Sequence, residues 1–157
     1  MSTWYETATA LIAPFEGCQI LRGDKVYPYF DTLAKPPLWT RGYGMTTGIS
    51  ESTKPISKQD AYAELVAATQ AYGLRVANLA PMLLEHPLAH AACTSWSYNC
   101  GLGAFKASRL RRALNDGRLA DACDLITKPN TAGGVVYKGL QRRRQAEATL
   151  MRQAFFS

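Results

Sequence analysis

The sequence predicts an α+β domain, mostly helical, in which a small β-hairpin lobe and a larger helical lobe flank a cleft. Three observations support this fold class. Residues 3–15 repeat apolar side chains at a helical period, residues 26–49 are rich in aromatic, β-branched and turn-forming residues, and most of the remainder has a helical pattern. A chain of 157 residues can bury one core, so we expect a single domain, with the N-terminal helix and β lobe in residues 1–55 and the helical lobe in residues 56–157.

The first predicted helix ends at a carboxylate. Its apolar residues recur at the spacing of one helix face: Trp4, Ala8, Leu11, Ile12 and Phe15. Gly17 can end the helix, because glycine readily takes the left-handed backbone of a C-terminal cap. Glu16 then lies in the last turn, where the helix dipole disfavours a carboxylate by a few tenths of a kcal/mol up to about 1 kcal/mol. A structural acid gains little there, so Glu16 is a candidate catalytic residue.

The aromatic segment that follows has the composition of a small sheet or hairpin. The residues AKPP at 34–37 form a natural connection between two short strands. Asp31 then ends the first strand and Thr40 lies on the second. We expect these two side chains to face each other across the turn.

The rest of the chain is predicted to be helical. Ser57 is a candidate N-cap with Asp60 at the third position, and a long helix follows through residue 80. Glycine- and proline-containing turns separate the later predicted helices, which cover residues 87–99, 105–115, 118–127 and 136–155.

The last predicted helix carries charges on its apolar face. The positions with the spacing of a buried stripe are Leu140, Arg143, Arg144, Glu147, Leu150, Met151 and Ala154. Buried charges are costly unless they are paired, so the two arginines need carboxylate partners. Glu147, four residues after Arg143, is one candidate, and a catalytic carboxylate elsewhere in the chain is another.

The distribution of charge and the lack of a metal-binding motif limit the functions that the sequence can have. Residues 106–157 hold 11 basic and 4 acidic residues, a net charge of +7, whereas residues 1–105 hold 7 and 8. This imbalance fits an anionic partner such as an acidic cell-wall polymer, a nucleic acid or a membrane surface, and it fits a solvated helical face equally well. The two histidines, His86 and His90, lack an HExxH pattern, so we expect neither a metal site nor a cofactor.

The cysteines and the N-terminus suggest a chain made in the cytoplasm. None of the cysteines lies in a CxxC pair, and we expect buried thiols at Cys18, Cys93, Cys100 and Cys123. No signal-peptide pattern is visible at the N-terminus, and no apolar run approaches the roughly 18 residues of a membrane anchor.

Five segments give the sequence a family resemblance. They are FEG at 15–17, YPYFD at 27–31, WTRGYG at 39–44, SYNCGLGAF at 97–105 and AGGVVYKGLQRRRQAE at 132–147. In this order the sequence resembles the phage-type lysozymes, or endolysins, of glycoside hydrolase family 24. The resemblance implies a monomeric, lysozyme-like muramidase that cleaves β-1,4 bonds between N-acetylmuramic acid and N-acetylglucosamine. It also implies action on peptidoglycan glycan strands in the periplasm after release through a holin-type hole, without nucleic acid as a partner.

The shared motifs assign the family's functional residues to positions of this sequence. Glu16 corresponds to the general acid, and Asp31 and Thr40 correspond to the pair that holds and activates a water. An arginine of the last helix is expected to reach Glu16. The substrate-binding or supporting residues that the resemblance implies are Tyr43, Asn99, Gly101, Phe105, Arg143, Arg144 and Glu147.

The sequence also departs from the family pattern. The gaps from Glu16 to Asp31 and from Asp31 to Thr40 are widened, and the first insertion brings in Asp24, a competitor for the role of Asp31. Two other functions therefore stay open. One is a lytic transglycosylase, which uses a single glutamate, and the other is a catalytically inactive basic module that binds cell wall or nucleic acid. Against nucleic acid, no helix-turn-helix signature is visible.

Overall fold

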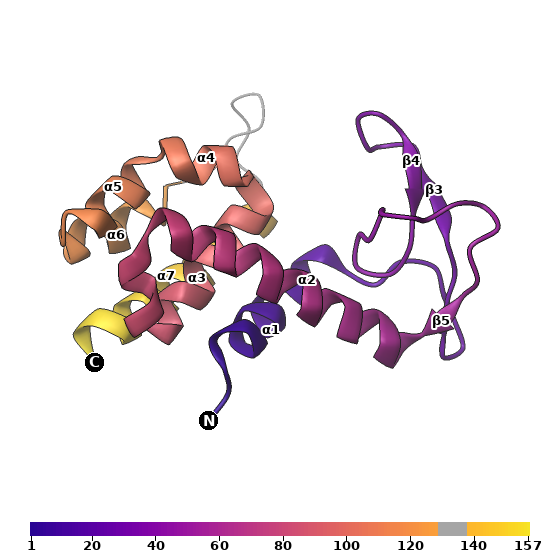
Figure 1. Cartoon of the computed structure of the whole chain (residues 1–157), viewed down its shortest axis with the longest axis horizontal. Helices are drawn as coiled ribbons and strands as arrows, with labels where there is room; N and C mark the ends of the chain where they lie inside the picture. Colours follow the sequence, from indigo (N-terminus) through magenta and orange to yellow (C-terminus); the bar gives the residue numbers. More distant parts are fainter. Residues whose placement is uncertain (129–137) are drawn as a thin grey trace. The chain divides into compact units, whose positions relative to one another are not determined.

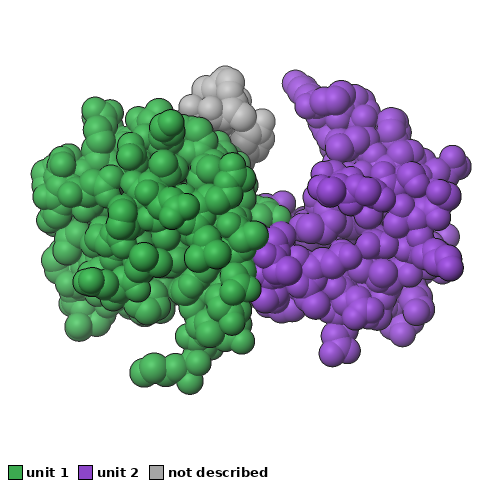
Figure 2. All heavy atoms as spheres, in the orientation of Figure 1, with its two compact units in different colours: residues 1–15, 69–157 green, residues 16–68 purple. Residues whose placement is uncertain are grey.

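The computed structural model describes residues 1–128 and 138–157, and packing divides the chain into two compact units (Figure 2). Unit 1 comprises residues 1–15 and 69–157, and unit 2 comprises residues 16–68. Each unit has its own secondary structure: unit 1 is helical, and unit 2 contains the strands (Figure 1). The α+β class is therefore confirmed, while a cleft between the lobes stays a prediction.

The first helix, except its last residue Glu16, belongs to unit 1, whereas the predicted lobes, residues 1–55 and 56–157, grouped this helix with the strands. Helix α1 (Trp4–Glu16) buries Ala8 and Ile12 completely. Its Trp4 ring stacks on the His90 ring with the centroids 3.8 Å apart. Burial of this apolar face attaches α1 to the helices that follow residue 69.

Unit 2 holds two small antiparallel sheets where the sequence predicted one small sheet or hairpin. One sheet has the strand order β1-β2-β5, and the other pairs β3 with β4. The strands are β1 (Leu21–Arg22), β2 (Lys25–Val26), β3 (Tyr29–Asp31), β4 (Leu38–Thr40) and β5 (Ile56–Ser57). The expected AKPP connection does lie between β3 and β4.

Helix α2 (Lys58–Leu79) begins in unit 2 and continues into unit 1. The predicted N-cap is confirmed, because the backbone N–H of Asp60 donates to Ser57 Oγ at 3.0 Å. None of the helices within residues 1–128 and 138–157 combines the length and apolar content that crossing a membrane requires.

Six further helices in the described residues complete unit 1 around a mostly apolar core. They are the 3₁₀ helix η1 (Pro81–Glu85), α3 (Pro87–Cys100), α4 (Leu102–Ala107), α5 (Arg109–Asn115), α6 (Leu119–Leu125) and α7 (Lys138–Phe156). Helix α3 packs along α7, and eight of its residues are buried. The first two residues of the helix predicted over 136–155 lie outside the described residues.

The continuous helix predicted over residues 105–115 is wrong. Ser108 has an extended backbone, with φ −74° and ψ 151°, so α4 ends before it and α5 begins after it. The Ser108 side chain accepts a hydrogen bond from the backbone N–H of Arg111 at 3.0 Å. A serine that satisfies an otherwise unpaired N–H starts a new helix, and this capping outweighs the helical periodicity of the flanking residues.

Candidate functional site

One pocket in unit 2 brings together the three candidate catalytic residues. Glu16, Asp31 and Thr40 all line this pocket, which has a volume of about 430 Å³. We call it the acidic pocket. Its other lining residues are Gln19, Tyr29, Leu33, Ala34, Leu38, Gly44 and Thr46. The pocket thus combines two carboxylates and hydroxyl groups with an apolar wall supplied by the β3–β4 connection.

Asp31 is oriented by the turn that follows β3. Its Oδ1 accepts hydrogen bonds from the backbone N–H groups of Leu33, at 2.9 Å, and Ala34, at 3.2 Å. An aspartate that binds the backbone two and three residues ahead is held by the turn itself. One carboxylate oxygen is therefore fixed in place, while Oδ2 has no hydrogen-bond partner within the described part of the chain.

The register of β3 and β4 corrects the expected pairing of Asp31 with Thr40. Tyr29 lies opposite Thr40, and Asp31 lies opposite Leu38. Because side chains two residues apart on a strand share a face, Asp31 and Thr40 are diagonal neighbours on one face of the sheet. Thr40 is buried, with 3% of its surface exposed, and its hydroxyl donates a long hydrogen bond of 3.4 Å to the carbonyl of Leu38.

Glu16 reaches the pocket from the end of α1. It is the last residue of that helix and is half-buried. Gly17 follows with φ 68°, a left-handed conformation that glycine adopts without strain, so the predicted helix stop is confirmed. This abrupt stop is what turns the chain from the helix into the strands.

Asp24, the competitor for the second carboxylate role, lies elsewhere in unit 2. It is exposed in the turn between β1 and β2, and its backbone carbonyl accepts a hydrogen bond from Lys58 N–H at 3.0 Å. The acidic pocket is lined by Asp31 and not by Asp24. The geometry therefore favours Asp31 over Asp24 as the second candidate carboxylate.

The segment that follows Thr40 packs into the interior of unit 2. Tyr43 is buried and packs edge-on against Tyr62, with ring centroids 6.0 Å apart. Burial raises the pKa of the Tyr43 phenol, and Cys18 and Tyr62 add to the shift. Tyr43 thus belongs to the packed interior of unit 2 rather than to the pocket lining.

Sequence reasoning missed the ion pair that anchors this motif. Arg41 binds Glu64 of α2 at 2.9 Å and donates to the backbone carbonyl of Lys54 at 2.7 Å. The residue after Thr40 is thereby tied to both α2 and the loop before β5. The arginine of WTRGYG was a visible signal, but its partner lies 23 residues away and no local pattern marks it.

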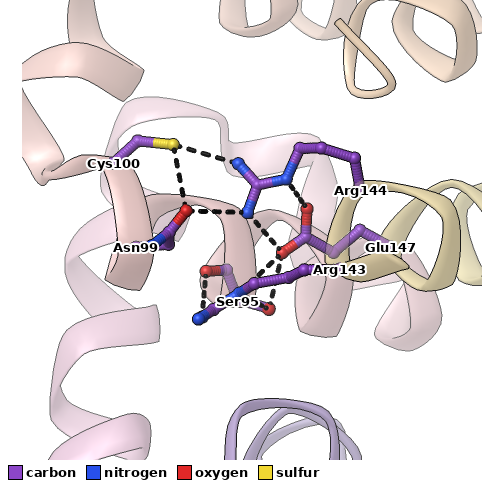
Figure 3. A network of polar contacts seen from close by, with 6 residues as sticks. All are labelled: Ser95, Asn99, Cys100, Arg143, Arg144 and Glu147. Carbon is purple, nitrogen blue, oxygen red and sulfur yellow. Dashed lines mark hydrogen bonds and ion pairs between the residues drawn. The ribbon is translucent and has the colours of Figure 1, made fainter. Parts of the chain in front are cut away.

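Unit 1 contains a buried polar network centred on Glu147 (Figure 3). Arg144 lies 2.8 Å from Glu147 Oε2 and donates to Oε1 at 3.0 Å, and Arg143 Nε lies 3.3 Å from Oε1. Ser95 Oγ donates to the same Oε1 at 2.7 Å. At most 2% of the surface of Arg143, Arg144 or Glu147 is exposed, so the prediction of a buried charged stripe with Glu147 as partner is confirmed.

Burial and the surrounding charges act in opposite directions on Glu147. Burial raises the pKa of this carboxyl, and Arg144, Ser95 and Arg143 lower it in that order, with a net shift upwards. Arg143 also donates to the backbone carbonyl of Ser95 at 2.9 Å. The contact expected between an arginine of this helix and Glu16 stays a prediction.

The remaining supporting residues connect this network to the core of unit 1. Asn99 is exposed, and its Oδ1 accepts a hydrogen bond from Arg144 at 3.1 Å, while Cys100 Sγ lies 3.1 Å from the same guanidinium. Gly101, with φ 97°, joins α3 to α4. Phe105 is fully buried against Trp96 and therefore supports the fold rather than offering a surface.

His90 and two of the cysteines are buried in the interior of the protein. His90 is buried, and its Nε2 lies 2.8 Å from the backbone carbonyl of Gly73. Cys93 and Cys123 are buried as expected, whereas Cys18 and Cys100 are only partly buried. No group of three or more potential metal ligands gathers within residues 1–128 and 138–157.

Comparison with known proteins places this arrangement in a family. The family model for phage lysozyme matches residues 15–147. The SAR-endolysin of Enterobacteria phage PA-2 is 30% identical over 144 residues, which cover 89% of this chain and 82% of that protein. The muramidase domain of SpmX from Asticaccaulis excentricus has a similar structure, with a TM-score of 0.71, 27% identity and coverage of 92% of this chain and 93% of that domain.

Another relative matches more strongly over a shorter stretch. The endolysin of Bacillus phage B103 is 48% identical over 59 residues, which are 38% of this chain and 22% of that protein. This chain therefore spans less than a quarter of the Bacillus phage endolysin that it matches. The family match, by contrast, extends from the residue before Glu16 to Glu147, and the chain belongs to the phage lysozyme family.

Proposed function

We propose that this chain hydrolyses the β-1,4 bonds between N-acetylmuramic acid and N-acetylglucosamine in bacterial peptidoglycan. The observation that carries the proposal is the presence of Glu16, Asp31 and Thr40 in the lining of one pocket. Family membership supports a lysozyme-type cell-wall enzyme, and the similarity to a muramidase domain supports this choice of bond. The periplasm is the proposed place of action, because the substrate lies there.

The proposed mechanism assigns a separate task to each carboxylate. Glu16 protonates the glycosidic oxygen, so that the leaving sugar departs as an alcohol. Asp31, together with the Thr40 hydroxyl, positions a water and accepts its proton as the water oxygen bonds to the anomeric carbon. The turn that fixes Asp31 Oδ1 supports this role, because it leaves Oδ2 for the water without side-chain rearrangement.

The experiment compares lysis by wild type, Glu16→Gln, Asp31→Asn and the matched control Asp24→Asn. Turbidity of outer-membrane-permeabilised Gram-negative cells is recorded at equal concentrations of folded protein. Loss of a general acid or base costs roughly 100-fold or more, so we expect both pocket variants to lose nearly all activity. Asp24→Asn should keep the wild-type rate, because Asp24 lies outside the pocket.

Product analysis separates the alternatives. Hydrolysis adds one water to each cleaved bond, whereas a transglycosylase forms an anhydro sugar without gaining water. Anhydro products, with lysis that survives both Asp31→Asn and Thr40→Ala, would replace hydrolysis by transglycosylation. If folded wild type gives no lysis and no cleaved glycan, the proposed activity is wrong.

A further inference from the structure

The ion pair between Arg41 and Glu64 lies wholly within unit 2 and begins at the residue after Thr40. The Arg41 guanidinium donates to Glu64 Oε1 at 2.9 Å and to the backbone carbonyl of Lys54 at 2.7 Å. Glu64 belongs to α2, and Lys54 lies in the loop before β5. Two segments of unit 2 that are distant in sequence are therefore joined to the residue that follows a candidate catalytic side chain.

This ion pair is better shielded from water than a pair on the protein surface. Only 11% of the Arg41 side chain and 37% of the Glu64 side chain are exposed, whereas the partners of the Arg118–Asp116 pair are 49% and 61% exposed. Arg41 Nε and Glu64 Oε2 are buried atoms. Charged hydrogen bonds are stronger where water is excluded, because solvent screens exposed pairs. The Arg41–Glu64 pair can therefore hold a backbone segment in place.

The segment that this pair holds is a short closed turn packed on α2. The backbone N–H of Arg41 donates to the carbonyl of Met45 at 2.9 Å, and the N–H of Met45 donates back to the carbonyl of Arg41 at 3.1 Å. Within the turn, a Cβ at Gly42 would lie 3.2 Å from Ala61 Cβ, so the backbone approaches α2 closely. The turn is thus fixed to α2 at two points, by packing at Ala61 and by the charge of Glu64.

The closed turn connects the ion pair to the acidic pocket. Thr46, the residue after the turn, lines both the acidic pocket and a second pocket of unit 2. This second pocket has a volume of about 290 Å³, and Arg41 and Glu64 are among its lining residues. Gly44, inside the turn, also lines the acidic pocket. A displacement of Arg41 therefore moves the wall of the acidic pocket.

The Thr40 hydroxyl depends on this support, because its own hydrogen bond is weak. It donates to the carbonyl of Leu38 at 3.4 Å, well beyond the distance of about 2.7–2.8 Å that hydroxyl donors prefer. Asp31, by contrast, is held by two backbone N–H groups of its own turn. A bond as long as that of Thr40 contributes little to the choice of a side-chain rotamer. The backbone that carries Thr40, anchored at Arg41, must then determine where the hydroxyl lies.

We propose that the Arg41–Glu64 ion pair positions the Thr40 hydroxyl for the reaction. The inference rests on the proposed function, in which Thr40 and Asp31 hold the attacking water. Neither Arg41 nor Glu64 lines the acidic pocket, so both act through Thr40 and not on the substrate. A displacement of about 1 Å in a reacting group can lower a rate by about 100-fold, so a small shift of this hydroxyl is sufficient to affect catalysis.

Steady-state kinetics on soluble peptidoglycan glycan strands test the positioning role. Each variant is assayed at a temperature at which circular dichroism shows that it is folded. Arg41→Gln should lower kcat by roughly 10- to 100-fold and change KM by less than about twofold, since the residues that line the pocket are unchanged. Glu64→Gln keeps an oxygen that can accept a hydrogen bond from Arg41, so it should lose less activity than Glu64→Ala.

A double-mutant cycle separates positioning from a general loss of stability. In the Thr40→Ala background no hydroxyl is left to position, so the addition of Arg41→Gln should change kcat by less than about twofold. A purely structural ion pair would lower kcat by the same factor with and without the Thr40 hydroxyl. That result would overturn the inference.

A measurement on the Thr40 side chain tests the inference without catalysis. Three-bond NMR couplings from the Thr40 methyl carbon to the backbone nitrogen and carbonyl carbon report the χ1 rotamer. Wild type should show the couplings of one rotamer, whereas Arg41→Gln and Glu64→Ala should show values averaged over at least two rotamers. Couplings that stay unchanged in both variants would contradict the positioning role.

The matched control is Arg22→Gln, which removes the same charge from the same unit. Arg22 lies in β1, outside the acidic pocket, with its guanidinium 5.1 Å from the centroid of the Tyr27 ring. This variant should keep the wild-type kcat and the wild-type couplings of Thr40. An equal loss of kcat in Arg22→Gln and Arg41→Gln would mean a general effect of net charge, and the positioning role would be wrong.

The two proposals fail in different ways. Wild type that cleaves no glycan refutes the muramidase proposal, and the Thr40 couplings still decide whether the ion pair orients this side chain. Wild type that cleaves glycan, with an unchanged kcat in Arg41→Gln and Glu64→Ala, refutes the positioning role alone.

Discussion

The hydrogen bond from Ser95 to Glu147 provides a sharp test of the buried network. Both residues are fully buried, and the Ser95 hydroxyl donates to Glu147 Oε1 at 2.7 Å. A hydrogen bond to a charged group contributes about 1.5–3 kcal/mol to stability. Ser95→Ala removes this bond but keeps the Ser95 carbonyl, to which Arg143 donates. We expect a loss of about 2 kcal/mol, which for a chain of this size lowers Tm by about 4–8 °C.

Ser97→Ala is the matched control on the same helix. Ser97 is also fully buried, but its hydroxyl has no hydrogen-bond partner within the described residues. Removing an unsatisfied hydroxyl costs little, so its free energy of unfolding should stay within about 0.5 kcal/mol of wild type. Chemical denaturation at neutral pH, followed by circular dichroism, measures both variants.

The pH dependence adds a second readout. Burial holds the pKa of Glu147 above its unfolded value, so ionising this group costs stability as pH rises through the folded pKa. The Ser95 hydrogen bond lowers that pKa and reduces the cost. The stability gap between wild type and Ser95→Ala should therefore be widest at neutral pH and shrink as the solution is acidified towards the unfolded pKa. A gap that stays constant with pH, or an equal loss in Ser97→Ala, would refute this reasoning.

Two further predictions concern packing in unit 1 and thiol accessibility. In Gly73→Ala the new methyl group overlaps the Trp4 ring and Thr94 Oγ1, and overpacking of this kind costs about 1–3 kcal/mol. Gly103→Ala, where the space is open, should be neutral or stabilising by up to about 1 kcal/mol, and equal Tm values for the two variants would contradict the packing at Trp4. A thiol reagent added to the folded chain should label Cys18 and Cys100 first, since Cys93 and Cys123 are buried and burial raises the pKa of the Cys93 thiol. Labelling of Cys93 as fast as Cys18, read by mass spectrometry of peptides, would contradict its burial.

Local signals in the sequence predicted much of the fold. The stop of α1 at Gly17 and the cap of α2 at Ser57 depend on residues within a few positions of each other, and both are confirmed. The charged stripe of α7 was also visible, because helical periodicity alone puts Arg143 and Glu147 on one face. Ser95, which donates a hydrogen bond to Glu147, lies on α3, so the periodicity of α7 could not indicate it.

Contacts between residues that lie far apart in the sequence could not be predicted. Strand β5 at Ile56–Ser57 is only two residues long and pairs with β2 at Lys25–Val26, a register that no periodicity specifies. Similarly, Phe105 lies within a family motif, yet its side chain is packed in the core, because a motif does not distinguish a residue that supports a site from one that lines it. The acidic pocket was more predictable, since Asp31 and Thr40 lie on adjacent strands of one hairpin.

The division of unit 1 into two chain segments has a consequence for biosynthesis. Residues 16–68 leave the ribosome as one continuous stretch, so unit 2, with its acidic pocket, is complete early. Helix α1 is made before unit 2, but Gly73 and His90, which lie against its Trp4, follow after unit 2, and Glu147 with its arginines comes later still. Translation thus leaves Trp4 of α1 without these two partners until residue 90 has been made. A nascent chain stalled before α7 carries the candidate catalytic carboxylates on a protein whose helical unit is unfinished.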